Sequence, residues 1–307
     1  MGSDEKFDAI VVGGGLAGCA AAYTLAKEGL EVALIERGQS CGAKNVTGGR
    51  IYAHSLDRLI PDFETTAPLE RKITKERVML ARADDWTTIE YGRGEADANA
   101  ASYSVLRNKL DAWLAERAEE AGAMTVCGIR VDKLLQKDGA VRGVVADGDV
   151  LEADCVILAE GVNGLLAQKV GLKKELMPHQ AAVGVKEIIK LDEETINDRF
   201  GLESGEGAAL LIAGDASGGA EGGGFLYTNK DSISIGTVAT LSHIGAGGRV
   251  KVPDMIDRLK EHPGIAPLLR GGEAREYAAH LVPEAGANMT PELFWNGVLA
   301  CGDAAGG

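Results

Sequence analysis

Paired cysteines and long apolar runs are both missing from this 307-residue sequence. Its five cysteines are scattered without a CxxC pair, which argues against a zinc ribbon, an iron–sulfur site within this stretch, or a disulfide framework. No apolar run approaches the roughly 20 residues that span a bilayer, and the N-terminus lacks the pattern of a signal peptide. We therefore expect no metal, reduced thiols and a cytoplasmic protein. Any membrane contact is expected to be peripheral, on the inner face of the cell membrane.

A basic block is missing as well. Lysine and arginine number 32 against 46 aspartates and glutamates, so the formal net charge is −14. Because such a field repels phosphate backbones, we expect no nucleic-acid partner. Glycine is in excess, with 42 residues, roughly twice the usual share of ~7%. Glycines that are neither periodic nor confined to a tail predict places where the backbone approaches a ligand closely.

The N-terminal part of the sequence has the pattern of a βαβ unit. A short apolar run over residues 7–12 predicts a buried strand, and the Ala-rich residues 16–27 predict a helix that ends near Gly29. A second apolar run, residues 32–35, predicts the next strand. Together these segments predict two parallel strands joined by a crossover helix.

The turn between the first strand and this helix reads Gly13-x-Gly15-x-x-Gly18. Glycines are needed there because the turn is tight, because a pyrophosphate must contact the backbone, and because the helix must pack closely on its strand. The helix N-terminus then supplies amides and a positive dipole end. Glu36 follows Gly18 by 18 residues, where a carboxylate can accept hydrogen bonds from both hydroxyls of an adenosine ribose. The pattern predicts dinucleotide binding and disfavours the 2′-phosphate of NADP.

Short strands and turns follow a longer helix. Residues 102–121 have the apolar spacing of an amphipathic helix. The turn dipeptides Asp138-Gly139 and Asp147-Gly148 separate short β-like runs, and residues 155–159 predict another buried strand. These segments extend the α/β pattern of the N-terminal part.

The remainder of the chain changes character. Residues 176–285 alternate as antiparallel strands do, with a glycine-rich loop at 214–224 and a helix near 253–260. Residues 297–301 then predict a strand that leads into a glycine-rich turn. Because such a turn should feed a helix, we expect the sequence to be cut short.

The last segment carries the first family resemblance. Cys301-Gly-Asp303-Ala-Ala-Gly306 resembles the second FAD motif of the glutathione-reductase-like FAD superfamily. The resemblance implies that Asp303 contacts the ribityl and pyrophosphate region of FAD. Leu106-Arg107-x-x-Leu110-Asp111-x-x-Leu114 is similar to a third shared element of that superfamily. There the resemblance implies that Arg107 lies near the FAD phosphates, whereas the residues alone also allow a surface arginine on an amphipathic helix.

A closer resemblance covers essentially the whole sequence. It rests on the segments 44–52, 183–187, 222–231 and 280–286, which resemble the FixC type of electron-transfer-flavoprotein:quinone oxidoreductase. The resemblance implies an FAD-dependent oxidoreductase in a FixABCX-like complex. Such an enzyme takes electrons from electron-transfer flavoprotein subunits, passes them to quinone and works beside a small ferredoxin-like protein.

Two groups of candidate site residues follow. Gly48 and Gly49 would let backbone amides approach the flavin ring, and Lys44 could raise the reduction potential or be a solvated loop lysine. No residue is assigned as catalytic, although Lys44 and His280 are candidates. The expected cofactor-binding residues are Gly13, Gly15, Leu16, Ala17, Gly18, Glu36, Arg37, Lys44, Asn45, Thr47, Gly48, Gly49, Arg107, Val131, Gly161, Gly302 and Asp303.

The expected fold is α/β, a Rossmann-like FAD-binding domain with an inserted, mainly antiparallel substrate domain. We expect residues 1–80, 100–175 and 286–307 to form a discontinuous FAD-binding domain whose C-terminal part is missing. Residues 81–99 and 176–285 are expected to form the substrate or quinone domain.

Two alternatives stay open. The first is a flavin-dependent geranylgeranyl or prenyl-lipid reductase, a related group whose substrate domain usually has a stretch resembling YxWxFP. Residues 224–229 lack its tryptophan and proline. The second is a chain that binds FAD only structurally, or a truncated product without catalysis.

Overall fold

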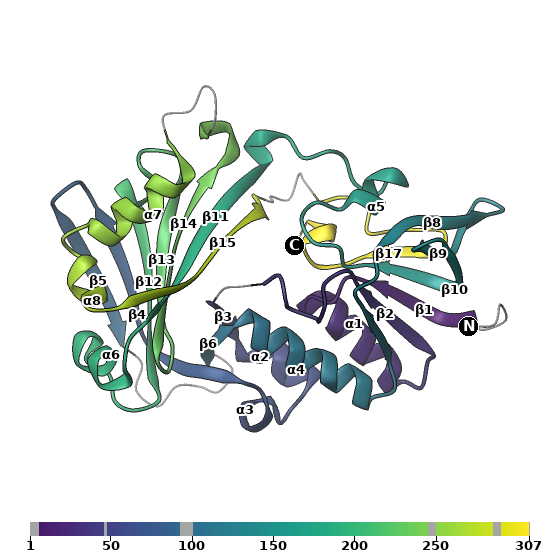
Figure 1. The fold of residues 1–307 in the computed structure, drawn as a ribbon, viewed down its shortest axis with the longest axis horizontal. Helices are drawn as coiled ribbons and strands as arrows, with labels where there is room; N and C mark the ends of the chain where they lie inside the picture. The colour runs from purple at the N-terminus through teal and green to yellow at the C-terminus, as the bar shows by residue number, and fades with distance from the viewer. Residues whose placement is uncertain (1–5, 46–47, 93–100, 245–249, 285–289, 307) are drawn as a thin grey trace. The chain divides into compact units, whose positions relative to one another are not determined.

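The computed structural model describes residues 6–45, 48–92, 101–244, 250–284 and 290–306 of the chain. Contacts divide the chain into two compact units, each made of separate segments. Unit 1 consists of Met1–Asn45, Asn108–Met177 and Ala285–Gly307, and unit 2 consists of Val46–Arg107 and Pro178–Glu284. Each unit has its own β-sheet (Figure 1).

Unit 1 is built on a sheet of eight strands in the order β16-β17-β10-β1-β2-β7, with a β8–β9 hairpin joined to β10. The strands β17, β10, β1, β2 and β7 are paired in parallel, the arrangement that crossover helices produce. The elements are β1 (Lys6–Val12), α1 (Leu16–Lys27), β2 (Val32–Glu36), α4 (Arg107–Glu120), β7 (Met124–Cys127), β8 (Val131–Lys137), β9 (Ala140–Ala146), β10 (Asp149–Leu158), α5 (Leu165–Lys169), β16 (Phe294–Trp295), β17 (Val298–Ala300) and the 3-10 helix η6 (Gly302–Ala305).

The core of unit 1 follows from the apolar runs of the sequence. Ile10, Leu34 and Leu158 are fully buried on neighbouring strands. Small residues of α1, among them Ala22 and Ala26, are buried as well, so this helix packs closely on the sheet.

The hairpins of unit 1 turn at the two predicted dipeptides. All four residues have positive φ, with 52° at Asp138, 74° at Gly139, 48° at Asp147 and 91° at Gly148. This is the type I′ geometry that matches the twist of a two-residue hairpin. The prediction of turns at these positions is confirmed.

Unit 2 contains a sheet of nine strands in the order β15-β11-β14-β13-β12-β4-β6-β3, with β5 paired to β4. Every pairing is antiparallel except that of β12 with β4. Its elements are β3 (Gly48–Tyr52), α2 (Ala53–Leu59), α3 (Phe63–Thr66), β4 (Leu69–Ala81), β5 (Trp86–Gly92), β6 (Ser102–Leu106), η2 (Pro178–Gln180), β11 (Ala181–Lys190), α6 (Glu193–Phe200), β12 (Glu206–Gly214), η3 (Asp215–Ser217), β13 (Gly222–Thr228), β14 (Ser232–Thr240), η4 (Leu241–His243), α7 (Val252–Glu261), α8 (Ala266–Leu269) and β15 (Glu273–Pro283).

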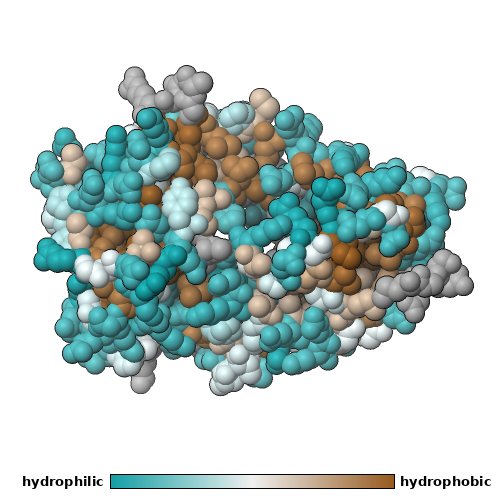
Figure 2. Space-filling model, in the orientation of Figure 1, coloured by the Kyte–Doolittle hydropathy of each residue, from teal (hydrophilic) through white to brown (hydrophobic). Residues whose placement is uncertain are grey.

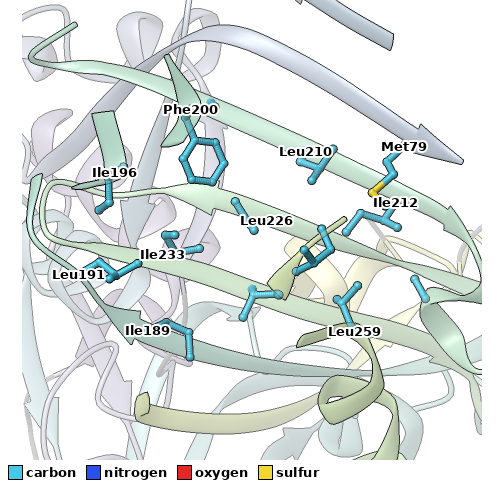
Figure 3. Packing of buried hydrophobic residues seen from close by; sticks show 14 of the residues in the cluster. Met79, Ile189, Leu191, Ile196, Phe200, Leu210, Ile212, Leu226, Ile233 and Leu259 are labelled. Atoms are coloured by element: carbon cyan, nitrogen blue, oxygen red, sulfur yellow. The ribbon is translucent and has the colours of Figure 1, made fainter. Parts of the chain in front are cut away.

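Helices α6, α7 and α8 cover one face of this sheet. Phe200 of α6 and Leu259 of α7 belong to the same buried cluster as Leu226 and Ile233 of the strands (Figure 3). The opposite face carries exposed apolar side chains, of which Leu211 is 52% exposed. The sheet is therefore packed on one face and partly open on the other.

Local signals define the ends of α6. The carboxylate of Asp192 accepts a hydrogen bond from the Thr195 amide at 2.8 Å, which satisfies one of the free amides at a helix N-terminus. The hydrogen bonds from Thr195 lower the pKa of Asp192. The helix ends at Gly201, whose φ of 63° is left-handed, a conformation that glycine adopts without strain.

The surface is mostly hydrophilic on the face drawn in Figure 2, where apolar residues gather in separate patches. One such patch lies over the part of unit 2 that contains β11 and β14 in Figure 1. No helix in the described part of the chain is long and apolar enough to cross a membrane.

The expected fold class is confirmed, but the units divide the chain differently from the expected domains. Residues 46–80 and 100–107, expected in the FAD-binding domain, belong to unit 2, because β3, β4 and β6 are hydrogen-bonded into its sheet. The helix expected over 102–121 begins only at Arg107. Residues 102–106 form the buried strand β6 instead, and the C-terminal part of the expected loop 214–224 is the start of β13.

Candidate functional site

Two of the three motif glycines between β1 and α1 have no room for a side chain. A Cβ atom on Gly13, where φ is 111°, would lie 2.3 Å from the carbonyl oxygen of Ala159. On Gly18 it would lie 1.8 Å from the carbonyl oxygen of Gly13. At Gly15, by contrast, no described heavy atom lies within 4 Å of such a Cβ. Gly13 and Gly18 are thus needed for packing, and Gly15 borders open space.

The N-terminus of α1 is suited to an anion. Gly15 is its N-cap residue, and within the described residues no side chain caps the helix. Its first turn, which includes Leu16 and Ala17, contains no acidic residue. Free amides and the positive end of the helix dipole therefore meet at Gly15. Together with the open space at Gly15, these features fit the pyrophosphate of a dinucleotide.

Glu36 lies at the end of β2, beside this turn. Its carboxylate accepts a hydrogen bond from the Gly14 amide at 2.7 Å and another from the Gly38 amide at 2.6 Å. The two loops that follow β1 and β2 are thereby joined. Because a carboxylate has about four acceptor positions, two are left for ribose hydroxyls, so ribose binding by Glu36 stays a prediction.

The second glycine motif packs directly on the first. Gly302 has a φ of 63°, and a Cβ on it would lie 2.7 Å from the Cβ of Ala17. This close approach brings the 3-10 helix η6 to the first turn of α1. Asp303, the next residue, is exposed, and its main-chain carbonyl accepts a hydrogen bond from Lys173 at 3.1 Å. The two predicted FAD motifs thus meet within unit 1.

The loop after β10 lies at the same edge of the sheet. Glu160 accepts hydrogen bonds from the amides of Leu166 at 3.0 Å and Ala167 at 2.8 Å. This carboxylate therefore caps the short helix α5. Gly161, which precedes that helix, has a φ of 74° and no described heavy atom within 4 Å of a Cβ built on it. The space beside Gly161 is therefore free of described protein atoms, as a position next to a bound ligand must be.

The other expected cofactor-binding residues of unit 1 differ in exposure and in their contacts. Lys44 and Arg37 are exposed, and Val131 is half-buried at the start of β8. The side chain of Asn45 donates a hydrogen bond to Asp111 of α4 at 2.5 Å. Asp111 is fully buried, so it anchors the end of the Lys44–Asn45 segment. Thr47 lies outside the described residues.

Four of the predicted residues that the structure describes belong to unit 2. Gly48 and Gly49 lie in strand β3, paired with β6, rather than in a loop. A Cβ on Gly48 would lie 1.8 Å from the Oγ of Ser234, so the packing of unit 2 itself requires glycine there. Arg107 is the first residue of α4, and His280 lies on β15 opposite Gly184 of β11.

Three residues that support the site were not predicted from the sequence. A Cβ on Gly14 would lie 2.5 Å from the Sγ of Cys41, and the Gly13-Gly14-Gly15 run is a signal that could have found it. Asp111 lies within the Leu106–Leu114 motif that contains Arg107, and this motif could have indicated its role. Lys173 has no signal in the sequence, because its role depends on contacts between loops that are distant along the chain.

The thiols beside the first loop are protonated. A hydrogen bond with Cys19, together with burial, holds the pKa of Cys41 well above its ordinary value. Burial is the main cause that raises the pKa of Cys127 to about 11. Because the thiolate is the reactive form, these cysteines act as packing residues.

Unit 2 contains a hollow of about 180 Å³. The guanidinium of Arg50 donates to both carboxylate oxygens of Glu76, at 2.8 and 3.1 Å, and lies 4.7 Å from the ring centroid of Tyr52. Burial raises the pKa of Tyr227, so its hydroxyl stays a hydrogen-bond donor. The lining consists of Arg50, Tyr52, Glu76, Arg77, Val78, Ala209, Leu211 and Tyr227. Apolar side chains and flat rings, beside the Arg50–Glu76 ion pair and Arg77, suit a small planar ligand with polar edges.

Comparisons with solved structures agree on the fold. The chain superposes on a geranylgeranyl bacteriochlorophyll reductase-like protein from Thermoplasma acidophilum with a TM-score of 0.78 and 22% identity, over 98% of this chain and 72% of the other. For the myxobacterial chondrochloren halogenase CndH, an FAD-dependent halogenase, the TM-score is 0.77 with 19% identity, over 98% of this chain and 69% of the other.

Comparisons of sequence identify the family. A family model described as "Glucose inhibited division protein A" matches residues 8–200. Protein FixC of Salmonella typhi is 56% identical over 305 residues, which are 99% of this chain and 71% of the relative. The "Probable electron transfer flavoprotein-quinone oxidoreductase YdiS" of Escherichia coli is 52% identical over the same shares of both chains. The chain therefore belongs to the FixC-type family of electron-transfer-flavoprotein:quinone oxidoreductases and is an FAD-dependent oxidoreductase of electron transfer.

Proposed function

We propose that this protein takes electrons from electron-transfer flavoprotein subunits and passes them to quinone in a FixABCX-like complex. The observation that carries the proposal is the 52% identity with a relative whose name specifies this reaction. The 56% identity with Protein FixC supports it as well. A small ferredoxin-like protein is the further partner we propose. Because quinones are membrane-soluble, we place the protein in the cytoplasm, peripherally at the inner face of the cell membrane.

The glycine motifs of unit 1 would hold the FAD. The amides of Gly15, Leu16 and Ala17 and the dipole of α1 would bind the pyrophosphate, and Glu36 would accept from the ribose. Asp303, brought to α1 by the packing of Gly302 on Ala17, would contact the ribityl side. Bound FAD supplies reversible uptake and release of electrons. The task of the protein residues is to hold it and to keep its phosphate charge balanced.

The hollow of unit 2 is the site we propose for the quinone ring. Val78 and Leu211 offer apolar contact, and Tyr227 is a hydrogen-bond donor for a carbonyl oxygen. Electron transfer to quinone needs such a ring site but no acid–base dyad. A flat ring with carbonyl acceptors at its edge fits this combination, which supports a quinone.

An anaerobic assay tests this function. The flavin of the holoprotein is photoreduced, a short-chain quinone is added, and the return of the oxidised flavin absorbance is followed. We expect rapid reoxidation. A flavin that stays reduced would contradict quinone as the acceptor and would favour a prenyl-lipid substrate.

Substitution in the hollow makes the test specific. Leu211→Glu places a charge against the proposed quinone ring and should slow reoxidation by quinone, while reoxidation by ferricyanide is unchanged. Val150→Glu is the matched control, since Val150 is 55% exposed on β10 of unit 1. Equal quinone rates for L211E and V150E would contradict a quinone site in the hollow.

A further inference from the structure

Lys173 is a buried lysine that joins two loops of unit 1. The residue is only 8% exposed. The Nζ atom donates to the carbonyl of Val162 at 2.8 Å and to the carbonyl of Asp303 at 3.1 Å. These loops follow β10 and β17, which are neighbouring parallel strands. The lysine thus connects the loop after β10 with the turn that carries the second FAD motif.

The loop after β10 is shaped around this side chain. Gly164 has a φ of 51°, and a Cβ on it would lie 2.7 Å from the Cδ of Lys173. Glycine is therefore needed at 164 both for its backbone conformation and for the passage of the lysine. The backbone of this loop therefore depends on the position of the Lys173 side chain, which indicates that the contact is specific.

A buried ammonium is costly unless negative charge compensates it. The two hydrogen bonds described above join the Nζ atom of Lys173 to carbonyl groups, which are neutral. Burial lowers the pKa of Lys173, and the charges of Asp303 and Glu160 oppose that change. Both carboxylate oxygens of Glu160 already accept hydrogen bonds from amides of α5. A methionine of similar length would fill this space without the cost of burying a charge. The presence of a cation beside Asp303 and Glu160 therefore needs an explanation beyond packing.

The neighbouring cofactor site supplies one. Gly302 packs on Ala17 in the first turn of α1, so the turn held by Lys173 is continuous with the proposed pyrophosphate site. A dinucleotide brings two phosphate charges to that site. The cation at 173 is therefore placed where it can balance charge that arrives with the cofactor.

We propose that Lys173 is a positioning residue of the FAD site: it fixes the Asp303 turn against the loop after β10, and its positive charge favours the bound, negatively charged cofactor. The proposal rests on the FAD site described above and involves neither quinone nor protein partners. Lys173 acts through the turn that it holds and is not itself a catalytic residue.

Three variants test the proposal. Lys173→Met removes the charge and the donors at nearly constant length, and Lys173→Arg keeps the charge. Lys174→Met is the matched control, because Lys174 is the exposed neighbour. Apo-protein of each variant is titrated with FAD to measure the dissociation constant, and the midpoint potential of each holoprotein is measured by dye equilibration.

We expect K173M to raise the FAD dissociation constant about 10- to 100-fold, the loss typical of hydrogen bonds to a charged group. The midpoint potential of K173M should become more negative, because reduction adds negative charge to the bound cofactor and the variant removes a positive charge from its site. K173R should restore part of both properties, and K174M should change neither. If Lys173 had only a structural role, K173M would lower the free energy of unfolding of the apo-protein in urea. The midpoint potential would then keep its wild-type value.

Wild-type FAD affinity and midpoint potential in K173M would overturn the proposal. If K173M does not fold, Gly164→Ala decides instead, because its methyl group displaces the lysine side chain without removing the charge. Weaker FAD binding in G164A supports the proposal, and unchanged binding refutes it. Neither measurement uses quinone, so this proposal and the proposed quinone reaction can fail independently.

Discussion

Replacing Glu36 by glutamine tests whether its carboxylate holds the dinucleotide loop together. The two oxygens accept hydrogen bonds from the amides of Gly14 and Gly38 at 2.7 and 2.6 Å. Glutamine keeps one acceptor oxygen but turns an NH₂ group toward the other amide, so one charge-assisted bond is lost and the second becomes neutral. Since hydrogen bonds to charged groups contribute about 1.5–3 kcal/mol, we expect E36Q to lower the free energy of unfolding of the apo-protein by about 2 kcal/mol.

Urea unfolding of the apo-protein, followed by circular dichroism, measures this change. Glu28→Gln is the control, because Glu28 is an exposed residue that follows α1 and loses the same charge. Its free energy of unfolding should stay within about 0.5 kcal/mol of the wild type. Titration with FAD gives a second readout, in which we expect E36Q to bind about tenfold more weakly or worse. An E36Q apo-protein as stable as wild type would refute the reasoning.

Other predictions concern both units. Gly302→Ala should weaken FAD binding in a fluorescence titration, because its methyl group would meet Ala17, whereas Gly271→Ala has similar backbone strain at a φ of 77° with open space around it and should not. Arg71→Met removes a buried guanidinium that donates to three main-chain carbonyls and an amide oxygen. We expect a loss of about 3 kcal/mol in urea unfolding, against little change for the exposed Arg82→Met. Alkylation of Cys127, measured by mass spectrometry at pH 8, should be about 100-fold slower in the folded protein than after urea, since a pKa raised from 9.0 to about 11 leaves less thiolate. Equal rates before and after urea would contradict that reading.

Local sequence signals predicted the glycine turn and the hairpin turns of unit 1. The glycine turn after β1 and the type I′ hairpins depend on residues that are close in the chain, so Gly13, Gly18 and Asp138 could be assigned from their neighbours. The resemblance at residues 301–306 implied that Asp303 contacts FAD, which stays a prediction, and the structure packs Gly302 on Ala17 of α1.

Contacts between distant segments were harder to predict. Gly48 was expected to face a flavin, but its nearest constraint is Ser234 of β14, a pairing that no local pattern encodes. The strand over 102–106 was taken for part of a helix because its apolar residues continue into α4, although β-prone Tyr103 and Val105 lie within it. Lys173 was not predicted because its partners belong to separate loops.

The two glycine motifs can pack together only after most of the chain has been synthesised. The thiol of Cys301 reaches the carbonyl of Ala17 across 284 residues of sequence, and β17 completes a sheet whose first strand is β1. Contacts of such long range form late, because loop closure must precede them. A ribosome therefore releases nearly all of unit 2 before unit 1 can close. The nascent chain should therefore bind its flavin only once residues near 303 have emerged from the ribosome.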